Sequence, residues 1–362
     1  MTSDSATSDI AGSLLDYLRM TTGAQELTYA DPPQQIVGGF DTRIFAFQLA
    51  NAPASFSGPL ILRLFAEDDD PSRARWEGAV QNAVAGMGYP APRVLAVSSA
   101  TDILGATFLI MKRLPGRPML QAPTFAAMLA QAVRLLTAYP QVIAQYQVRL
   151  HALDPGPLLR AIEAEELPTA GPSEAGISRR SATLDGQLEQ LTHRIERLSL
   201  EQFRPALQWL LDNRPSDPAR PVICHGDFHP INILMADGVV TGVIDWPTTT
   251  VADAAFDVGN TRLLLAIAPM ELPAVLDSIV APLRRVMVRR YSQAYLRLRP
   301  VDVDHVRYFE ALRCLIELSW VGERRAIGAG MYRNPWGSTR SIGKLISHFQ
   351  QVTHVAPSLA PS

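Results

Sequence analysis

One short stretch of the sequence carries polar side chains at a spacing that suits chemistry. Residues 221–247 read PVICHGDFHPINILMADGVVTGVIDWP, and within them Asp227 is followed by Asn232 and, further on, by Asp245. The apolar runs around these side chains predict short strands, and the Asp-Gly pair between two of the runs predicts a hairpin turn, because glycine accepts the positive φ that such a turn requires. We therefore expect strands to hold two carboxylates and an amide close together.

Phosphoryl transfer uses such a set of side chains. One carboxylate orients the attacking hydroxyl and accepts its proton, while an amide and a second carboxylate hold the magnesium ions that bridge the ATP phosphates. Kinases place them as His-x-Asp, then Asn five residues after the Asp, then a metal-binding Asp, and the string beginning at His225 fits that order. An ordinary turn is one alternative. Another is a metal site on Cys224, His225 and His229, although no second Cys or His pair nearby completes a zinc set.

The stretch resembles the aminoglycoside phosphotransferase and choline kinase-like family, which shares the protein-kinase fold. The resemblance rests on His-Gly-Asp-x-His-x-x-Asn at residues 225–232 and Ile-Asp-Trp at residues 244–246. It implies an α+β, two-lobed protein kinase-like fold, with an antiparallel sheet and a helix in the N-lobe and a mostly helical C-lobe. It also implies an enzyme, an ATP- and magnesium-dependent phosphotransferase that moves the γ-phosphoryl group to a hydroxyl of a small-molecule alcohol.

The resemblance also assigns roles to residues. Asp227 is the expected catalytic base, and Asn232 and Asp245 are the expected ligands of Mg²⁺. His225 and Asp257 are expected to support the catalytic loop structurally. Asp257 follows Asp253 at a predicted helix start, where an aspartate is a favoured cap.

Four parts of the chain are expected, the two lobes from the resemblance and the two ends from the pattern of their residues. They are an N-terminal extension with an amphipathic helix at 1–29, a nucleotide-binding N-lobe at 30–112, a catalytic and acceptor-binding C-lobe at 113–352, and a loose tail at 353–362. Residues 154–178 are rich in Pro, Gly and Glu and predict an irregular insertion in the C-lobe.

Arg63 occupies the strand position where a kinase carries the lysine that holds the α- and β-phosphates. No lysine precedes Lys112 in the chain, so Arg63 must take this role in an active enzyme. Arginine is a forked donor and is not equivalent to lysine; the alternative is a surface arginine on an edge strand. A helical pattern follows at residues 70–87. In a kinase-like lobe the Glu of this helix pairs with the phosphate-binding cation, so the resemblance implies Glu77 as the partner of Arg63; the alternative is a solvated glutamate.

Two segments are expected to hold the rest of the nucleotide. Small residues at a turn between predicted strands would let the backbone approach the phosphates, and a later strand end resembles the hinge whose backbone binds adenine. The residues concerned are Gly38, Gly39 and Thr42 at the turn, and Met111, Lys112 through its carbonyl and Leu114 through its amide at the hinge. An ordinary turn and an ordinary strand-to-helix connection are the alternatives.

Composition excludes several classes of function. The 362 residues are 47% hydrophobic and carry a formal net charge of −2, which gives no electrostatic case for nucleic acid. The start of the chain is polar and lacks the features of a signal peptide. The sequence contains no run of about 18 uninterrupted apolar residues, so no membrane span is predicted. Two cysteines make no disulfide framework, so we expect a cytoplasmic protein.

The acceptor is expected to be a neutral or anionic, partly apolar alcohol. Residues 260–362 contain fourteen Lys or Arg against seven Asp or Glu, together with Trp320, Tyr332 and Trp336. A polycationic aminoglycoside would need clustered carboxylates, because each buried cation must be paired. The alternatives are an aminoglycoside acceptor, if those arginines face solvent, and a nucleotide-binding pseudokinase with a regulatory or scaffolding role, which Arg63 favours. A protein kinase is disfavoured because no Ala-Pro-Glu signature follows Asp245.

Overall fold

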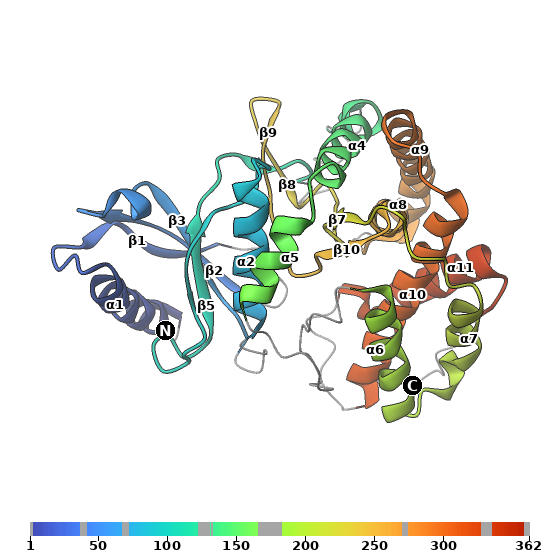
Figure 1. Ribbon diagram of the computed structural model, residues 1–362, viewed down its shortest axis with the longest axis horizontal. Helices are drawn as coiled ribbons and strands as arrows, with labels where there is room; N and C mark the ends of the chain where they lie inside the picture. The colour runs from blue at the N-terminus through green and yellow to red at the C-terminus, as the bar shows by residue number, and fades with distance from the viewer. Residues whose placement is uncertain are drawn as a thin grey trace. The chain divides into compact units, whose positions relative to one another are not determined.

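The computed structural model describes residues 3–36, 42–66, 72–121, 131, 133–165, 183–269, 274–326 and 335–357 (Figure 1). The chain divides into two units. The first contains Met1–Gly116, Gly156–Ser178 and Ala236–Pro247, and the second contains Arg117–Pro155, Arg179–Met235 and Thr248–Ser362. Among the described residues, no helix combines the length and the apolar character needed to cross a bilayer.

The first unit is built on a five-stranded antiparallel sheet. Its strand order is β1-β2-β3-β5-β4, and the strands are β1 (Thr28–Ile36), β2 (Arg43–Ala50), β3 (Pro59–Leu64), β4 (Val94–Ser98) and β5 (Phe108–Lys112). β3 lies in the middle of the sheet, where Leu60 pairs with Lys112 and Leu64 pairs with Phe108 across to β5. The central position explains why β3 is buried along almost its whole length.

Helices cover both faces of this sheet. The buried leucines of α1 (Ser3–Thr22) pack with Leu60, Leu62 and Leu64 on one face. α2 (Ser72–Gly86) packs against β4 and β5 on the other, and Figure 1 shows the two helices on opposite sides of the strands. Successive side chains of a strand point to opposite faces. Arg63, between Leu62 and Leu64, therefore belongs to the face that α2 covers.

The predicted irregular insertion is partly wrong. Gly156–Ala164 form a regular helix, α5, which packs against α2. Its buried residues Leu158 and Ile162 are four positions apart, a helical spacing that the abundance of Pro, Gly and Glu nearby obscured. Residues 166–178 of the predicted insertion lie outside the described residues. The first unit also contains the short helix η1 (Ala54–Phe56) and strand β9 (Val239–Val243).

The second unit is mostly helical. Its helices are α4 (Ala138–His151), α6 (Leu184–Arg197), η3 (Glu201–Phe203), α7 (Arg204–Asp212), α8 (Ala254–Ile267), α9 (Ala274–Leu298), α10 (Val303–Ala326), η5 (Pro335–Gly337) and α11 (Thr339–Thr353). α8 packs against α9 and α10, and α4 packs against α9. A Cβ on Gly259 would lie 2.8 Å from the carbonyl oxygen of Val306, so α8 and α10 can approach this closely only at a glycine.

Short strand pairs frame the loop that the sequence singles out. β7 (Val222–Cys224) pairs with β10 (Thr250–Ala252), and β8 (Ile233–Ala236) pairs with β6 (Arg117–Pro118). The loop between β7 and β8 is residues 225–232. As predicted, Asp237 and Gly238 form the turn after β8, with φ of 50° and 81°. An antiparallel sheet with flanking helices in one unit and a helical second unit confirm the predicted α+β class.

Candidate active site

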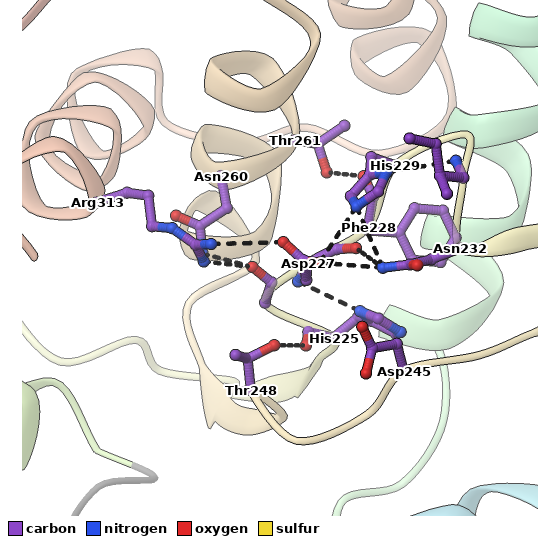
Figure 2. Close-up of polar contacts among 12 residues, drawn as sticks. His225, Asp227, Phe228, His229, Asn232, Asp245, Thr248, Asn260, Thr261 and Arg313 are labelled. Carbon is purple, nitrogen blue, oxygen red and sulfur yellow. Dashed lines mark hydrogen bonds and ion pairs between the residues drawn. The ribbon is translucent and has the colours of Figure 1, made fainter. Parts of the chain in front are cut away.

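Asp227 lies in the β7–β8 loop with both carboxylate oxygens in polar contact (Figure 2). Its Oδ2 accepts a hydrogen bond from the amide nitrogen of Asn232 at 3.0 Å and lies 3.2 Å from Nε2 of His229. Its Oδ1 lies 3.4 Å from a guanidinium nitrogen of Arg313, which comes from α10. The same Asn232 nitrogen also donates to the backbone carbonyl of Asp227 at 3.0 Å. The loop therefore folds back on its own carboxylate and holds it in one orientation.

The surroundings of Asp227 favour its ionised form. Burial by itself would raise the pKa of this carboxyl, but the charge and hydrogen bond of His229 and the charge of Arg313 hold the pKa well below its usual range. The side chain remains 22% exposed. Asp227 is thus a partly exposed carboxylate whose surroundings favour the ionised form.

One face of α8 holds the backbone of this loop. Asp257, Asn260 and Thr261 are spaced three and four residues apart, so they lie side by side on the helix. The carboxylate of Asp257 accepts from the backbone amides of His225 at 3.2 Å and Gly226 at 2.7 Å. Asn260 donates to the carbonyl of Gly226 at 3.2 Å, and Thr261 donates to the carbonyl of Phe228 at 2.9 Å. The helix is thereby hydrogen-bonded to the loop backbone on both sides of Asp227.

His225 and Asp257 have the geometry of supporting residues. His225 is fully buried, and its Nδ1 accepts from the backbone amide of Asp227 at 3.2 Å. The Thr248 hydroxyl donates to the carbonyl of His225 at 3.0 Å. Burial by itself would raise the pKa of Asp257, but hydrogen bonds from His151 and the Gly226 amide and the charges of both histidines hold it below its usual value. Asp257 is therefore an ionised acceptor for the loop amides.

A hydrogen-bond chain through three helices ends at Asp257. Nε2 of His151, on α4, lies 3.0 Å from Oδ2 of Asp257, and Nδ1 of His151 lies 2.6 Å from the hydroxyl of Tyr295, on α9. The atoms of His151, Cys224 and Asp257 that could bind a metal ion lie within 4.8 Å of one another. Both ring nitrogens of His151 already have protein partners, so this buried group fits a hydrogen-bond network better than a metal site.

Gly226 makes a close approach that a side chain would block. Its φ is 79°, and a Cβ at this position would lie 2.4 Å from the carbonyl oxygen of Thr248. Both the backbone conformation and the contact therefore require glycine immediately before Asp227.

Arg313 and Glu317 are functional candidates that the sequence did not single out. Arg313 donates to the carbonyl of Gly226 at 3.1 Å, approaches Asp227 and donates from Nε to Glu317 at 2.8 Å. Burial raises the pKa of Glu317, with Arg313 opposing that shift. In the sequence these residues are one arginine and one glutamate four apart on a long helix, and nothing there separates them from a solvated pair.

The second group of predicted residues belongs to the first unit. A guanidinium nitrogen of Arg63 on β3 donates to Oε1 of Glu77 on α2, and the other terminal nitrogen of Arg63 lies 3.3 Å from Oδ1 of Asp245. Arg63 and Glu77 are buried, whereas the side chain of Asp245 is 40% exposed. The forked guanidinium can reach two carboxylates at once, which a single ammonium group does less well. The predicted pairing of Arg63 with Glu77 is present, and the alternatives of a surface arginine and a solvated glutamate do not apply.

Asp245 follows β9 in a segment that packs within the first unit. It has a φ of 70°, in the left-handed region. Before it, the Val243 amide donates to the carbonyl of Pro90 at 2.7 Å. After it, the buried ring of Trp246 packs edge-on against Tyr89 at 5.8 Å and donates to the carbonyl of Val243 at 3.0 Å. Both neighbours fix the backbone, so the Asp245 carboxylate is presented from an anchored turn.

The predicted hinge residues lie at the end of β5. Met111 and Lys112 are its last two residues, and the Lys112 side chain donates to the carbonyl of Ser57 at 2.6 Å. Leu114 lies so close to β9 that a Cβ on Gly242 would be 2.2 Å from its side chain. The glycine was not predicted to matter, since a single glycine inside a strand has many explanations.

The predicted phosphate turn is described only in part. Gly38 and Gly39 lie outside the described residues. Thr42 stands directly before β2 and is half-buried. The expected roles of these three residues stay predictions.

The comparisons place the chain in a family. A family model described as "Phosphotransferase enzyme family" matches residues 33–301, most of the chain. The chain belongs to this phosphotransferase enzyme family, as the resemblance of the 225–232 and 244–246 motifs predicted.

Solved structures share the fold. The chain resembles a thermostable mutant of aminoglycoside phosphotransferase APH(4)-Ia in complex with ADP and hygromycin B, with a TM-score of 0.60 and 17% identity over 93% of this chain and 98% of that one. It resembles a macrolide 2'-phosphotransferase from Brachybacterium faecium at a TM-score of 0.55 and 20% identity, over 92% and 97%. It also resembles an ethanolamine kinase from Plasmodium vivax, with a TM-score of 0.59 and 14% identity over 93% of this chain and 89% of that one. The predicted kinase-like fold is confirmed.

Curated relatives match part of the chain. Acyl-CoA dehydrogenase family member 11 from Homo sapiens is 24% identical over 189 residues, which is 52% of this chain and 22% of the relative. Family member 10 from Mus musculus is 26% identical over 235 residues, 62% of this chain and 20% of the relative. The chain thus spans about a fifth of the length of these relatives.

Proposed function

We propose that this protein is an ATP- and magnesium-dependent kinase that phosphorylates a hydroxyl group of a small molecule. The observation that carries the proposal is the state of Asp227: an ionised, partly exposed carboxylate, oriented by Asn232 and His229 in a loop whose backbone α8 holds. A carboxylate in this state can accept a hydrogen bond from an acceptor hydroxyl and aim its oxygen for attack.

The low pKa of Asp227 supports orientation as its main task. In the loose transition state of phosphoryl transfer the new O–P bond is barely formed, so little positive charge has developed on the attacking hydroxyl oxygen and its proton is not yet strongly acidic. A strong base is then less important than a fixed one. Asp227 would hold the hydroxyl by its proton and receive that proton late, when the bond to phosphorus is largely formed.

Two other side chains suit magnesium. Mg²⁺ prefers hard oxygen ligands such as carboxylates and usually takes only one or two from the protein, with phosphate oxygens and waters completing the shell. Asp245 offers an exposed carboxylate on an anchored turn. The amide nitrogen of Asn232 donates to Asp227, which leaves its amide oxygen as the atom that would hold the ion. When bound, Mg²⁺ would neutralise the charge of the phosphate oxygens.

The nucleotide would be seated by the first unit. Arg63 is a fixed cation because it is paired with Glu77, and it would hold the α- and β-phosphates in the place of a lysine. The backbone of Lys112 and Leu114 would bind adenine, and Met111 would pack behind the ring. Gly38, Gly39 and Thr42 would cover the phosphates.

The charges on α10 support a neutral or anionic, partly apolar acceptor. Three carboxylates of α10 are already paired with arginines: Glu310 with Arg262, Glu317 with Arg313, and Glu323 with Arg194 and Arg197. A polycationic acceptor would have to displace these arginines and leave them unpaired, which is costly in a buried setting. Trp320, stacked on Arg194 at 3.7 Å, adds apolar surface to the same helix.

A pseudokinase is the second candidate, because Arg63 stands where active kinases carry lysine. Release of ADP on addition of a panel of alcohols separates the two functions. The panel should include hydroxy acids, macrolides, ethanolamine-type alcohols and kanamycin-type aminoglycosides. The kinase proposal expects turnover with a member of the panel and little with aminoglycosides, whereas nucleotide binding without any turnover would favour the pseudokinase.

A further inference from the structure

A second hydrogen-bond chain reaches the catalytic loop from the same three helices. The hydroxyl of Tyr291 on α9 donates to Oε1 of Gln147 on α4, and Nε2 of Gln147 donates to the hydroxyl of Thr261 on α8 at 3.0 Å. Thr261 in turn donates to the carbonyl of Phe228 at 2.9 Å. The three side chains are fully buried. The hydrogen-bond chain therefore ends at the backbone carbonyl of Phe228, the residue that follows Asp227.

This chain runs parallel to the one that ends at Asp257. Each helix contributes two residues four positions apart, which places them one turn apart on the same face. The pairs are Gln147 and His151 on α4, Asp257 and Thr261 on α8, and Tyr291 and Tyr295 on α9. One chain holds the amides before Asp227 and the other holds the carbonyl after it, so together they fix the loop at two points.

The direction of donation in the second chain is set by its middle member. Tyr291 and Thr261 carry hydroxyls that can donate or accept, but the Gln147 amide has a separate donor and acceptor. Its oxygen receives the Tyr291 proton, so its nitrogen must face Thr261, and the Thr261 proton is left for the Phe228 carbonyl.

Packing alone does not account for such a chain. Burying polar side chains is costly unless each is hydrogen-bonded, and apolar residues could join these helices without that risk. The distinctive feature is the end point, a backbone carbonyl beside Asp227.

We propose that Thr261, Gln147 and Tyr291 are positioning residues that set the place of Asp227 through the Phe228 carbonyl. The inference rests on the proposed kinase function for its catalytic consequence, but not for its effect on the loop. A misplacement of about 1 Å in a reacting group can cost about 10²-fold in rate.

The test compares three variants of the full chain. Thr261→Val removes the hydroxyl at nearly constant volume, and Thr261→Ser restores it. Thr353→Val is the matched control, because the buried Thr353 also donates its hydroxyl to a backbone carbonyl, that of Phe349 at 2.8 Å, but within α11. Hydrogen–deuterium exchange of residues 225–232, nucleotide affinity, melting temperature and ADP-release kinetics are measured for each variant.

Thr261→Val is expected to speed exchange in residues 225–232 and to lower kcat by about tenfold or more, with nucleotide affinity within about twofold of the parent. Thr261→Ser should restore both properties. Thr353→Val should lower the melting temperature without either effect. If Thr261→Val does not fold, Tyr291→Phe, which removes only the Tyr291 hydroxyl, takes its place and should show the same pattern to a smaller extent.

Unchanged loop exchange in Thr261→Val, or equal effects of the Val and Ser variants, would overturn the inference. Failure of the kinase proposal looks different: the parent protein would release no more ADP than Asp227→Asn. In that case loop exchange, which needs no turnover, still decides whether the chain holds the loop.

Discussion

At the scale of single residues, the proposed phosphate contact of Arg63 depends on its ion pairs. It is buried on the α2 face of the sheet and is shared between Glu77 and Asp245. Loss of one member of a buried ion pair leaves the other charge uncompensated, which typically costs about 3–5 kcal/mol, whereas loss of both costs less than the sum. The pair is therefore expected to act as a unit in stability and, under the proposed function, in nucleotide binding.

We predict that Arg63→Ala weakens nucleotide binding and that the effects of Arg63→Ala and Glu77→Ala are non-additive. Isothermal titration with an ATP analogue and a thermal-unfolding cycle of the two single variants and the double variant measure both properties. Arg63→Lys keeps the charge but not the fork, so its affinity should lie between that of the parent and Arg63→Ala. Independent, additive effects would show that Arg63 and Glu77 do not act together.

Sequence reasoning at this scale succeeded where a motif existed. Asp227, Asn232, His225 and Asp257 all stand in or around one loop, and Arg63 faces Glu77, as expected. It missed residues that reach the loop from distant helices, because a long-range contact leaves no local spacing in the sequence. The missed residues are His151, Gln147, Asn260, Thr261, Tyr291, Tyr295 and Arg313.

At the scale of elements, α8 is the helix on which the loop depends. Its buried face carries the anchors Asp257, Asn260 and Thr261, and Gly259 between them lets α10 approach. α10 also contacts the loop, through Arg313, which binds the Gly226 carbonyl and Asp227. Two helices therefore hold one loop.

The close passage of Gly226 past Thr248 gives an element-scale prediction. Gly226→Ala must bear both a positive φ and a contact with a backbone oxygen at 2.4 Å, so the loop has to move. Gly238→Ala is the matched control: its φ of 81° is equally unfavourable, but nothing lies within 4 Å of the added Cβ. The positive φ costs about 1–2 kcal/mol in either variant.

We expect Gly226→Ala to lower the free energy of unfolding by more than Gly238→Ala does and to reduce turnover strongly, while Gly238→Ala keeps near-parental turnover. Chemical denaturation and ADP-release assays provide the two measurements. Equal destabilisation and equal turnover of the variants would mean that the close approach to Thr248 has no role in shaping the loop.

Strands and helices with strong periodicity were predicted well. β3 and β5, as well as the helices after residue 250, follow from alternation or helical spacing, with ends shifted by a few residues. β6 and β10, of two and three residues, were not predicted, because their pairing partners β8 and β7 lie far along the chain. α5 was obscured by the composition of its surroundings.

At the scale of the whole molecule, each unit supplies part of the proposed chemistry. The first unit carries the fixed cation and Asp245, and the second carries Asp227 and Asn232. Family membership supports phosphotransfer, and the fold is shared with solved phosphotransferases and an ethanolamine kinase. The proposed preference for a neutral or anionic acceptor rests on the paired charges of α10.

Magnesium dependence is the first prediction for the whole molecule. ADP with Mg²⁺ should raise the melting temperature, because a ligand that binds only the folded state stabilises it. EDTA should remove most of this shift, and Asp245→Asn should reduce it even with Mg²⁺ present, since a carboxylate ligand is lost. An equal shift with and without the metal would argue against Asp245 as a magnesium ligand.

The second prediction for the whole molecule concerns the choice of acceptor. Aminoglycosides should be poor substrates because Glu310, Glu317 and Glu323 are already neutralised by arginines. Steady-state kinetics with kanamycin-type compounds beside hydroxy acids and macrolides measure this preference. A kcat/KM above about 10⁴ M⁻¹s⁻¹ for an aminoglycoside would contradict the charge argument.

The most direct measurement of the central claim is ADP release by Asp227→Asn with the best acceptor of the panel, beside nucleotide affinity by titration. The amide keeps the shape of the carboxylate but cannot receive the proton of the hydroxyl. The proposal predicts nucleotide affinity near that of the parent and a fall in kcat of about 10²- to 10⁴-fold. Turnover close to that of the parent would contradict the assignment of Asp227 and, with it, the proposed mechanism.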